Sequence, residues 1–165
     1  MAQDFSFDVV SRVNLQGVED AVNMVMKEIA NRFDFKGSIS RIELNKKDNQ
    51  LVIFAEDDNR LRTVQDMLAT RLVKRGVPLK NFDYKNAEAA ENSSVRQTVK
   101  IVQGLPSDKA KAVVQMVKGS GRKAIPSIQG EQVRVVSKSK DELQAIIVLL
   151  KSGDFGVDLQ FENYR

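Results

Sequence analysis

Two short segments of the chain alternate charged and aromatic side chains, a pattern suited to binding nucleobases and phosphates. They are Arg32-Phe33-Asp34-Phe35-Lys36 and Phe161-Glu162-Asn163-Tyr164-Arg165. A ring or a guanidinium plane can stack on a base, and a basic side chain can pair with phosphate. Burial in a core is the competing interpretation of the three phenylalanines, whereas their neighbours on a strand would face the other way. The candidate binding residues are therefore Arg32, Asp34, Lys36, Tyr164 and Arg165.

The net charge of +4 lies entirely in the second half of the chain. Residues 1–90 carry equal numbers of basic and acidic side chains, so the whole excess falls in 91–165. This asymmetry favours an anionic partner such as phosphate, a nucleotide or RNA. A solvated surface of mixed charge explains so small an excess equally well. On the first interpretation, one anion-binding face combines Arg32 with some of four residues: Arg96, Lys100, Arg134 and Lys138.

The composition argues against an enzyme. The chain contains neither histidine nor cysteine, which excludes an imidazole base, a thiol nucleophile and a thiolate metal site. The densest acidic group is Glu56-Asp57-Asp58, and acids at a helix start are better explained as caps than as a magnesium site. The glycine-rich segments lack the P-loop and dinucleotide-binding spacings. We therefore expect no catalytic residue, no metal site and no cofactor.

One order of elements occurs twice along the chain. Each half is expected to run strand, helix, strand, strand, helix, strand, which is the ferredoxin-like split βαβ order. Apolar residues alternate in the strands and recur every three or four positions in the helices. The predicted fold class is therefore α+β, with two ferredoxin-like (βαββαβ) domains. Their antiparallel sheets carry helices on one face and leave the other face open, where ferredoxin-like proteins often stack bases.

Several local features accompany this pattern. Residues 33–44 are predicted to form one strand, with a bulge or bend near Gly37 where the alternation slips. Asn14, Asp58, Ser107 and Ser139 are predicted to cap the four helices. Residues 85–94 contain no large apolar side chain, so this segment is expected to be an exposed linker.

Six segments of the chain resemble blocks of the bacterial YajQ family, in order and over essentially its whole length. They are Phe7 to Ser11, Asn31 to Gly37, Leu72 to Gly76, Ile128 to Val135, Lys138 to Ala145 and Leu159 to Arg165. The resemblance implies that the two domains exchange their amino-terminal strands. Domain 1 would then span 12–104, including strand 95–103, and domain 2 would combine 105–165 with strand 4–11. The pattern alone would instead pair each strand with its own half.

The resemblance also implies a function, since the family is described as nucleotide-binding, with cyclic di-GMP and RNA or tRNA named as ligands. We expect a non-enzymatic protein that binds cyclic di-GMP or a GTP-like nucleotide as a signalling effector and passes the signal to a regulatory protein. An RNA-binding module and a protein-interaction scaffold are the alternatives. The chain has no apolar run that could span a membrane, so we expect a cytoplasmic location.

A further expectation concerns where a nucleotide would bind. Junctions between domains are common ligand sites. The group of Arg32, Asp34 and Lys36 belongs to the first domain, and Tyr164 and Arg165 end the chain in the second. We expect both groups to approach one cleft, where a guanine stacks on Tyr164 or an arginine and its phosphates meet Arg32.

Overall fold

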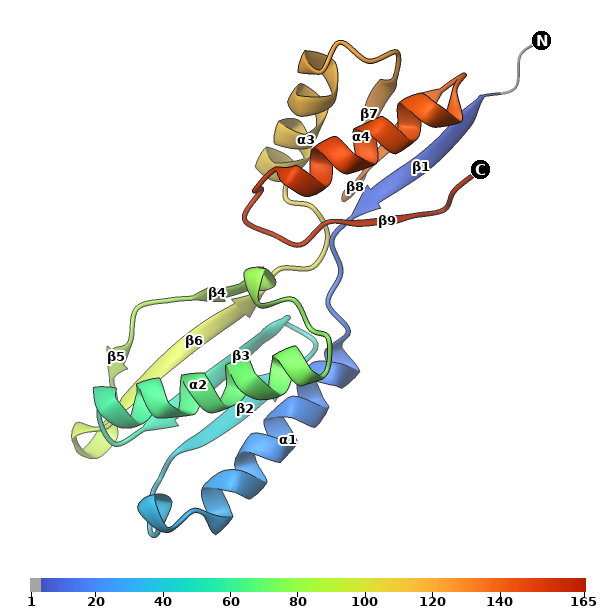
Figure 1. Cartoon of the computed structure of the whole chain (residues 1–165). Coiled ribbons are helices and arrows are strands. Elements are labelled where there is room, and N and C mark those ends of the chain that lie inside the picture. Colours follow the sequence, from blue (N-terminus) through green and yellow to red (C-terminus); the bar gives the residue numbers. More distant parts are fainter. Residues whose placement is uncertain (1–3) are drawn as a thin grey trace. The chain divides into compact units, whose positions relative to one another are not determined.

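The computed structural model describes residues 4–165, which form two compact domains (Figure 1). Domain 1 is Val13–Ile101, and domain 2 combines residues 4–12 with Val102–Arg165. The chain passes from one domain to the other after Arg12 and again after Ile101. Domain 1 is therefore one continuous segment, whereas domain 2 is assembled from the two ends of the chain.

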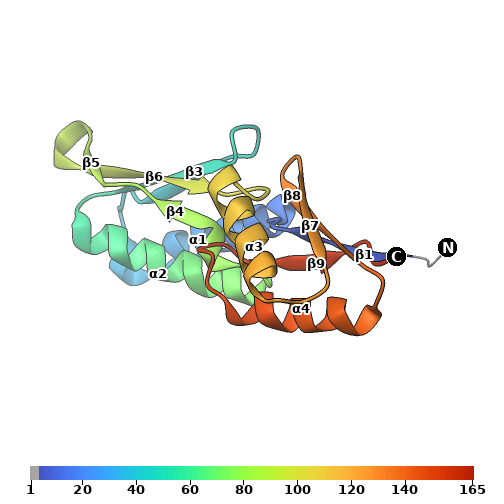
Figure 2. The same ribbon diagram turned by 90° about the horizontal axis from the view of Figure 1, so that it is seen from above.

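Domain 1 is an antiparallel sheet with two long helices on one face (Figures 1 and 2). The strands lie in the order β2-β3-β6-β4, and the short β5 pairs with β6. Burial alternates along β3 and β6, because one side chain in two faces the helices. The elements are α1 (Leu15–Asn31), the 3-10 turn η1 (Phe33–Phe35), β2 (Arg41–Asn45), β3 (Gln50–Ala55), α2 (Asp58–Lys74), η2 (Leu79–Asn81), β4 (Phe82–Tyr84), β5 (Glu88–Ala89), η3 (Glu91–Ser93) and β6 (Val95–Ile101).

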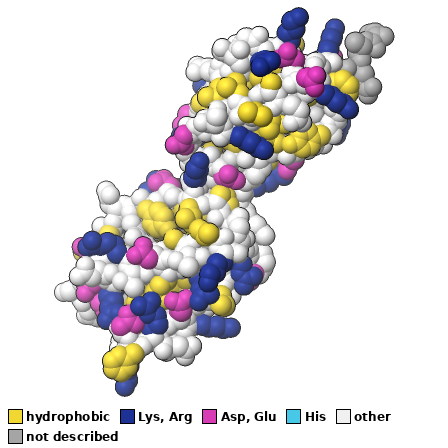
Figure 3. All heavy atoms as spheres, viewed as in Figure 1, with side chains coloured by type: hydrophobic (Ala, Val, Ile, Leu, Met, Phe, Trp, Pro, Cys, Tyr) yellow, Lys and Arg dark blue, Asp and Glu magenta, His cyan; other side chains and the backbone are white. Residues whose placement is uncertain are grey.

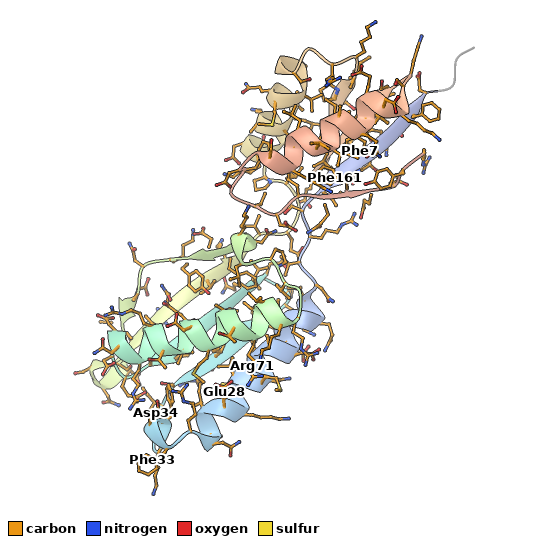
Figure 4. All side chains as sticks on the ribbon, in the orientation of Figure 1. Phe7, Glu28, Phe33, Asp34, Arg71 and Phe161 are labelled. Carbon is orange, nitrogen blue, oxygen red and sulfur yellow. The ribbon has the colours of Figure 1, made fainter. Side chains whose placement is uncertain are left out.

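Domain 2 repeats this plan with a four-stranded antiparallel sheet of order β7-β8-β1-β9. Its core gathers around Phe7 and Val9 of the central strand, both fully buried. Phe161 packs edge-on against Phe7, with ring centroids 5.9 Å apart (Figure 4). The elements are β1 (Phe5–Val10), α3 (Ser107–Gly119), β7 (Ile125–Gln129), β8 (Gln132–Ser137), α4 (Lys140–Ser152) and β9 (Gln160–Glu162).

The strands are exchanged, as the family resemblance implied. The amino-terminal β1 pairs with β8 in a register that runs from Phe5↔Ser137 to Val9↔Val133, and it pairs with β9 on its other side. In domain 1, β6 takes the place that β1 leaves, between β3 and β4. Both ferredoxin-like domains are therefore confirmed, and the expectation from the pattern alone, that each strand stays in its own half, is wrong.

The helix caps follow the sequence in two places and shift by one residue in the other two. Asn14 and Ser139 accept main-chain N–H bonds as predicted. The cap of α2 is Asp57, which accepts from the Arg60 N–H, and Asp58 is the first helical residue. Pro106 precedes α3 without a side-chain cap bond. A serine or aspartate thus indicates that a helix starts nearby, but the first residue of the helix can differ from the predicted one by a residue or two.

Two irregular segments of domain 1 differ from the sequence interpretation. The predicted strand 33–44 contains the turn η1 and a left-handed Gly37 (φ +74°), and only Arg41–Asn45 is strand. Residues 85–94 are mostly exposed, but they lie within domain 1 and include β5, which pairs with the start of β6. This segment therefore forms part of the rim of the sheet.

Candidate functional site

The open face of the domain 1 sheet carries an aromatic ring between two arginines. The register aligns Arg41 of β2, Phe54 of β3 and Arg96 of β6 in one row across three strands. All three side chains point away from the helices, because their strand neighbours Ile42, Ile53, Ala55, Val95 and Gln97 face the other way. The Arg41 guanidinium lies 3.9 Å from the Phe54 ring centroid. This row is called the Phe54 platform.

A hollow of about 800 Å³ lies over the Phe54 platform. Its wall is the segment that precedes β6, and its lining includes Ile39, Ala89, Ala90, Glu91, Asn92 and Ser94. Asn92 and Ser93 both have left-handed backbones (φ +57° and +62°), although neither is glycine. Such conformations are uncommon and cluster where a structure holds a ligand. The size falls within the range of small-molecule pockets.

Carboxylates hold both arginines of the Phe54 platform. Arg41 Nε donates to Glu43 Oε1 (3.2 Å) along β2. Arg96 donates to Glu88 Oε2 through Nη2 and Nε (3.2 and 3.4 Å). All four side chains are between 45% and 66% exposed, so these are surface pairs that a phosphate could replace at low cost.

Lys100 lies on the same open face as the Phe54 platform. It is four residues beyond Arg96 on β6, a separation of about 13 Å along the strand. Its cross-strand neighbours are Gln50 and Asp83. The sequence analysis therefore predicted Lys100 as a site residue and included Arg96 among the candidates for an anion-binding face. It did not identify Arg41 or Phe54.

The turn η1 presents Phe33 to solvent, contrary to its interpretation as a core residue. The Phe33 side chain is 89% exposed, whereas Phe35 is buried as expected. Figure 4 shows the Phe33 ring projecting away from the fold, next to Asp34. A 3-10 turn replaces the two-residue alternation of a strand with three residues per turn, so Phe33 and Phe35 need not share a face.

Ion pairs connect the residues around this turn. Arg32 donates to both carboxylate oxygens of Asp34 (3.0 and 2.9 Å), and this bonding raises the pKa of Arg32 and lowers the pKa of Asp34. The guanidinium of Arg32 lies over the Phe35 ring, 5.4 Å from its centroid. Glu28, which approaches Arg32, also accepts two bonds from Arg71 of α2 (Figure 4). The Arg32 side chain is 40% exposed, and its guanidinium lies beside Asp34, Glu28 and the Phe35 ring.

Arg32 and Lys100 do not share one face of domain 1. Arg32 covers a core ring beside the helices, whereas Lys100 points to the open side of the sheet. Lys36 follows η1 and is exposed. On the helix-covered face, basic and acidic side chains are interspersed (Figure 3), so this surface has the mixed charge of an ordinary solvated surface.

In domain 2, Arg134 is bound to a buried carboxylate. Arg134 Nε and Nη2 donate to Asp8 (2.9 and 3.3 Å), and Asp8 is only 3% exposed. Asn163 Nδ2 also donates to Asp8, at 2.9 Å. Asp8 therefore neutralises Arg134 on the open face of domain 2, and a role of Arg134 in nucleotide binding stays a prediction.

The other predicted residues of domain 2 lie at two separate places. Lys138 follows β8 and lines a hollow of about 510 Å³ with Arg122 and Lys123. Tyr164 and Arg165 follow β9 and line a smaller groove beside α4. Arg32 belongs to domain 1, and the shared cleft expected from the sequence stays a prediction.

Two features are absent from the described residues. Within residues 4–165, no group of three or more acidic side chains converges to hold a metal ion. Over the same residues, no helix is both long enough and apolar enough to cross a membrane.

Comparisons with known proteins place the chain in a family. A family model described as "Nucleotide-binding protein YajQ-like" matches residues 5–165. A nucleotide-binding protein of Elusimicrobium minutum is 50% identical over 162 residues, which cover 98% of this chain and 99% of that protein. Nucleotide-binding proteins of Carboxydothermus hydrogenoformans and Bacillus cereus are 48% and 47% identical over 165 residues, the full length of each pair. The chain therefore belongs to the YajQ-like family.

Proposed function

We propose that this chain is a non-enzymatic, cytoplasmic nucleotide-binding protein, and that the Phe54 platform binds a guanine nucleotide such as cyclic di-GMP. One observation carries the proposal: an aromatic ring and two arginines meet on an open sheet face beneath a hollow of about 800 Å³. Relatives that match over their full length are named nucleotide-binding proteins, which supports the same ligand class.

The chemistry of the platform suits both parts of a nucleotide. A base can stack on Phe54 in place of the Arg41 guanidinium or between the two, because both groups are planar. Phosphates can then pair with Arg96 and Lys100, which lie on the same strand. In this proposal the protein acts as an effector, and a regulatory protein partner receives the signal. Roles of Lys36 and Lys138 in nucleotide binding stay predictions.

The first test measures binding after the stacking ring is removed. Phe54→Ala is expected to weaken cyclic di-GMP binding by roughly tenfold or more, since stacking on an aromatic side chain contributes about 1–3 kcal/mol per base. Calorimetry on the full chain with cyclic di-GMP, GTP and tRNA gives the affinities. Phe33→Ala is the control: it removes an exposed ring from another part of the same domain and should leave binding unchanged. Equal affinities for Phe54→Ala and the unaltered chain would refute the site.

RNA is the second candidate ligand, because Lys100, Gln50 and Asn45 extend the open face beyond the platform. Salt separates the two candidates. Binding of an RNA that contacts many phosphates should fall steeply between 50 and 200 mM salt through counterion release. Binding of a dinucleotide in the hollow should depend on salt much less. Tight, steeply salt-dependent tRNA binding without cyclic di-GMP binding would favour the RNA module.

A second prediction concerns the carboxylate that holds Arg96. Glu88→Gln is expected to strengthen nucleotide binding by roughly two- to fivefold, because Glu88 competes with phosphate and such surface pairs contribute about 0.2–1 kcal/mol. Glu162→Gln is a matched control, since Glu162 pairs with Arg12 in domain 2. Titration calorimetry compares the three chains at low salt. Weaker binding in Glu88→Gln would mean that Glu88 positions Arg96 for the ligand instead of competing with it.

A further inference from the structure

One edge of the domain 1 sheet is open along β2. This strand is the first in the order β2-β3-β6-β4, and within residues 4–165 no strand pairs with its outer side (Figure 1). A groove of about 780 Å³ runs along that side, between β2 and α1. Its lining includes Val22 and Met26 of α1 and Ile42 and Leu44 of β2. An open edge of this kind can pair with a strand of another molecule.

Every second residue of β2 directs its main-chain groups into this groove. The alternation is fixed from the far side of the sheet, where Lys85 N–H donates to the Thr98 carbonyl, so the even-numbered residues of β6 bond towards β4. The odd-numbered residues of β6 then bond towards β3, and the registers carry this alternation on to β2. Glu43 therefore bonds to β3, whereas Ile42 and Leu44 direct their N–H and C=O groups outward.

A weak acceptor covers one of these outward groups. The Ile42 N–H donates to the Met26 sulfur at 3.2 Å. A thioether sulfur is a weak acceptor on a flexible, unbranched side chain. Met26 is only partly buried against the core, so it can move aside. The carbonyl of an added strand would be a stronger acceptor for the same N–H.

Charge selects one register for pairing with a second copy of β2. Two such strands pair antiparallel about a two-fold axis when outward-directed residues lie opposite each other. An axis at Ile42 places Arg41 opposite Glu43 of the second copy, and it does so twice. An axis at Arg41 or Glu43 would oppose two identical charges, and an axis at Leu44 would oppose Glu43 to the neutral Asn45. Opposite charges across a strand pair are favourable and like charges are not, so the axis at Ile42 is favoured.

We propose that β2 is a homodimer interface, through which two copies of domain 1 join their sheets edge to edge about an axis at Ile42. The Ile42 N–H and C=O of each copy bond to those of the other, and each Leu44 N–H donates to the Ser40 carbonyl of the second copy. Arg41 and Glu43 are 45% and 61% exposed, and they exchange their bond within one strand (3.2 Å) for two bonds across the axis. The interface needs no nucleotide, so it stands or fails independently of ligand binding at the Phe54 platform.

The test is sedimentation equilibrium of the full chain without ligand, over a range of concentrations. The unaltered chain should dimerise reversibly as its concentration rises. Arg41→Glu and Glu43→Arg should each weaken the dimer at least tenfold, because each opposes like charges twice across the axis. The double variant Arg41→Glu/Glu43→Arg restores opposite charges, so its dissociation constant should return to within about threefold of the original. Lys111→Glu, an exposed charge reversal in domain 2, is the control and should leave the dimer unchanged.

A mixture of the two single variants tests the register itself. One chain then carries only acidic side chains at positions 41 and 43, and the other carries only basic ones. Neither variant should dimerise well alone, but the equimolar mixture should form a heterodimer at least as tightly as the unaltered chain, because both facing pairs are opposite in charge. Damage to the fold in either variant would not be repaired by mixing.

Amide hydrogen exchange supplies an independent measurement. The Leu44 N–H points to water in the monomer and should become protected as the chain concentration rises. The Glu43 N–H bonds to β3 in both states, so its exchange should stay unchanged and serves as an internal control. A chain that is monomeric at every concentration would overturn the proposal and leave this edge to an extended segment of another protein. A dimer that neither single variant weakens would also overturn it, because the copies would then meet elsewhere.

Discussion

A chain that begins at residue 12 is expected to lose the fold of domain 2 while it retains that of domain 1. The deletion removes β1, the strand that lies between β8 and β9. It takes away Phe7 and Val9, both fully buried in the domain 2 core. Truncating one buried phenylalanine already costs about 3–5 kcal/mol, a large part of the total stability of a small domain.

Amide NMR spectra of the truncated chain test this expectation. Signals from 102–165 should collapse to the narrow range of an unfolded chain, and those from 13–101 should stay dispersed. Addition of a synthetic peptide with the sequence of residues 1–11 should restore the domain 2 signals, since the strand pairs through main-chain bonds and inserts two apolar side chains. Dispersed signals from 102–165 without the peptide would show that β1 is dispensable.

Asp8→Asn is expected to lower the free energy of unfolding by about 2–3 kcal/mol at neutral pH, because hydrogen bonds to a charged group are stronger than neutral ones. The Asp8 carboxylate accepts from Arg134, Asn163 and Gln132 and is almost completely buried. Its pKa lies below the ordinary value, chiefly because of the Arg134 bond and then the Asn163 bond, although burial acts in the opposite direction.

This lowered pKa sets the pH at which the effect disappears. The ionised carboxylate stabilises the fold fully above 3.8, the ordinary pKa of the unfolded chain, and the contribution is lost as the pH falls through the lower pKa of the folded state. Urea unfolding gives the free energy of unfolding of Asp8→Asn and of the unaltered chain. The difference between the two should be large at pH 7 and smaller at pH 3. Asp4→Asn, at an exposed position of the same domain, is the control. A difference that is the same at both pH values would contradict this account.

The same bond changes how Arg134 should be tested. From the sequence alone, Arg134 is predicted to lie at an exposed position of a strand, where a substitution changes the stability of the fold little. In the structure its carboxylate partner lies 126 residues away. Replacement of Arg134 by alanine would leave Asp8 buried without its main partner. Lost ligand binding in that variant would therefore not separate the loss of a ligand contact from damage to the fold.

The elements of the fold were predictable because their signals are local. Apolar spacing identifies the α1 and α4 faces. In α4 the residues at this spacing are Leu143, Ile146, Ile147 and Leu150, and all four are buried. The strand exchange was not predictable from the pattern, because strands 4–11 and 95–103 both fit the first position of either unit. The choice depends on tertiary packing, and strand 4–11 pairs with residues more than a hundred positions away. Only the family resemblance indicated it.

The candidate site was harder to predict, because exposure is decided by the tertiary fold. Phenylalanine is a residue type that is usually buried. The outward position of Phe54 follows from its alternation with the buried Ile53 and Ala55. That alternation was present in the sequence and could have identified the ring. Phe33 is the opposite case, because a turn of three residues interrupts the strand expected there. Lys100 was predictable because an isolated charge in an amphipathic strand faces solvent.

The pairing of β1 with β8 also constrains the order of events during synthesis on the ribosome. The strand around Phe7 leaves the ribosome before its partner at Val135, which follows about 130 residues later, and this takes roughly 7–26 s at typical elongation rates. Domain 1 is continuous and complete once Ile101 has emerged, so it can fold during that interval. The nascent chain thus carries an unpaired apolar strand while domain 1 folds behind it, and this strand is the segment that a chaperone would have to shield during the interval.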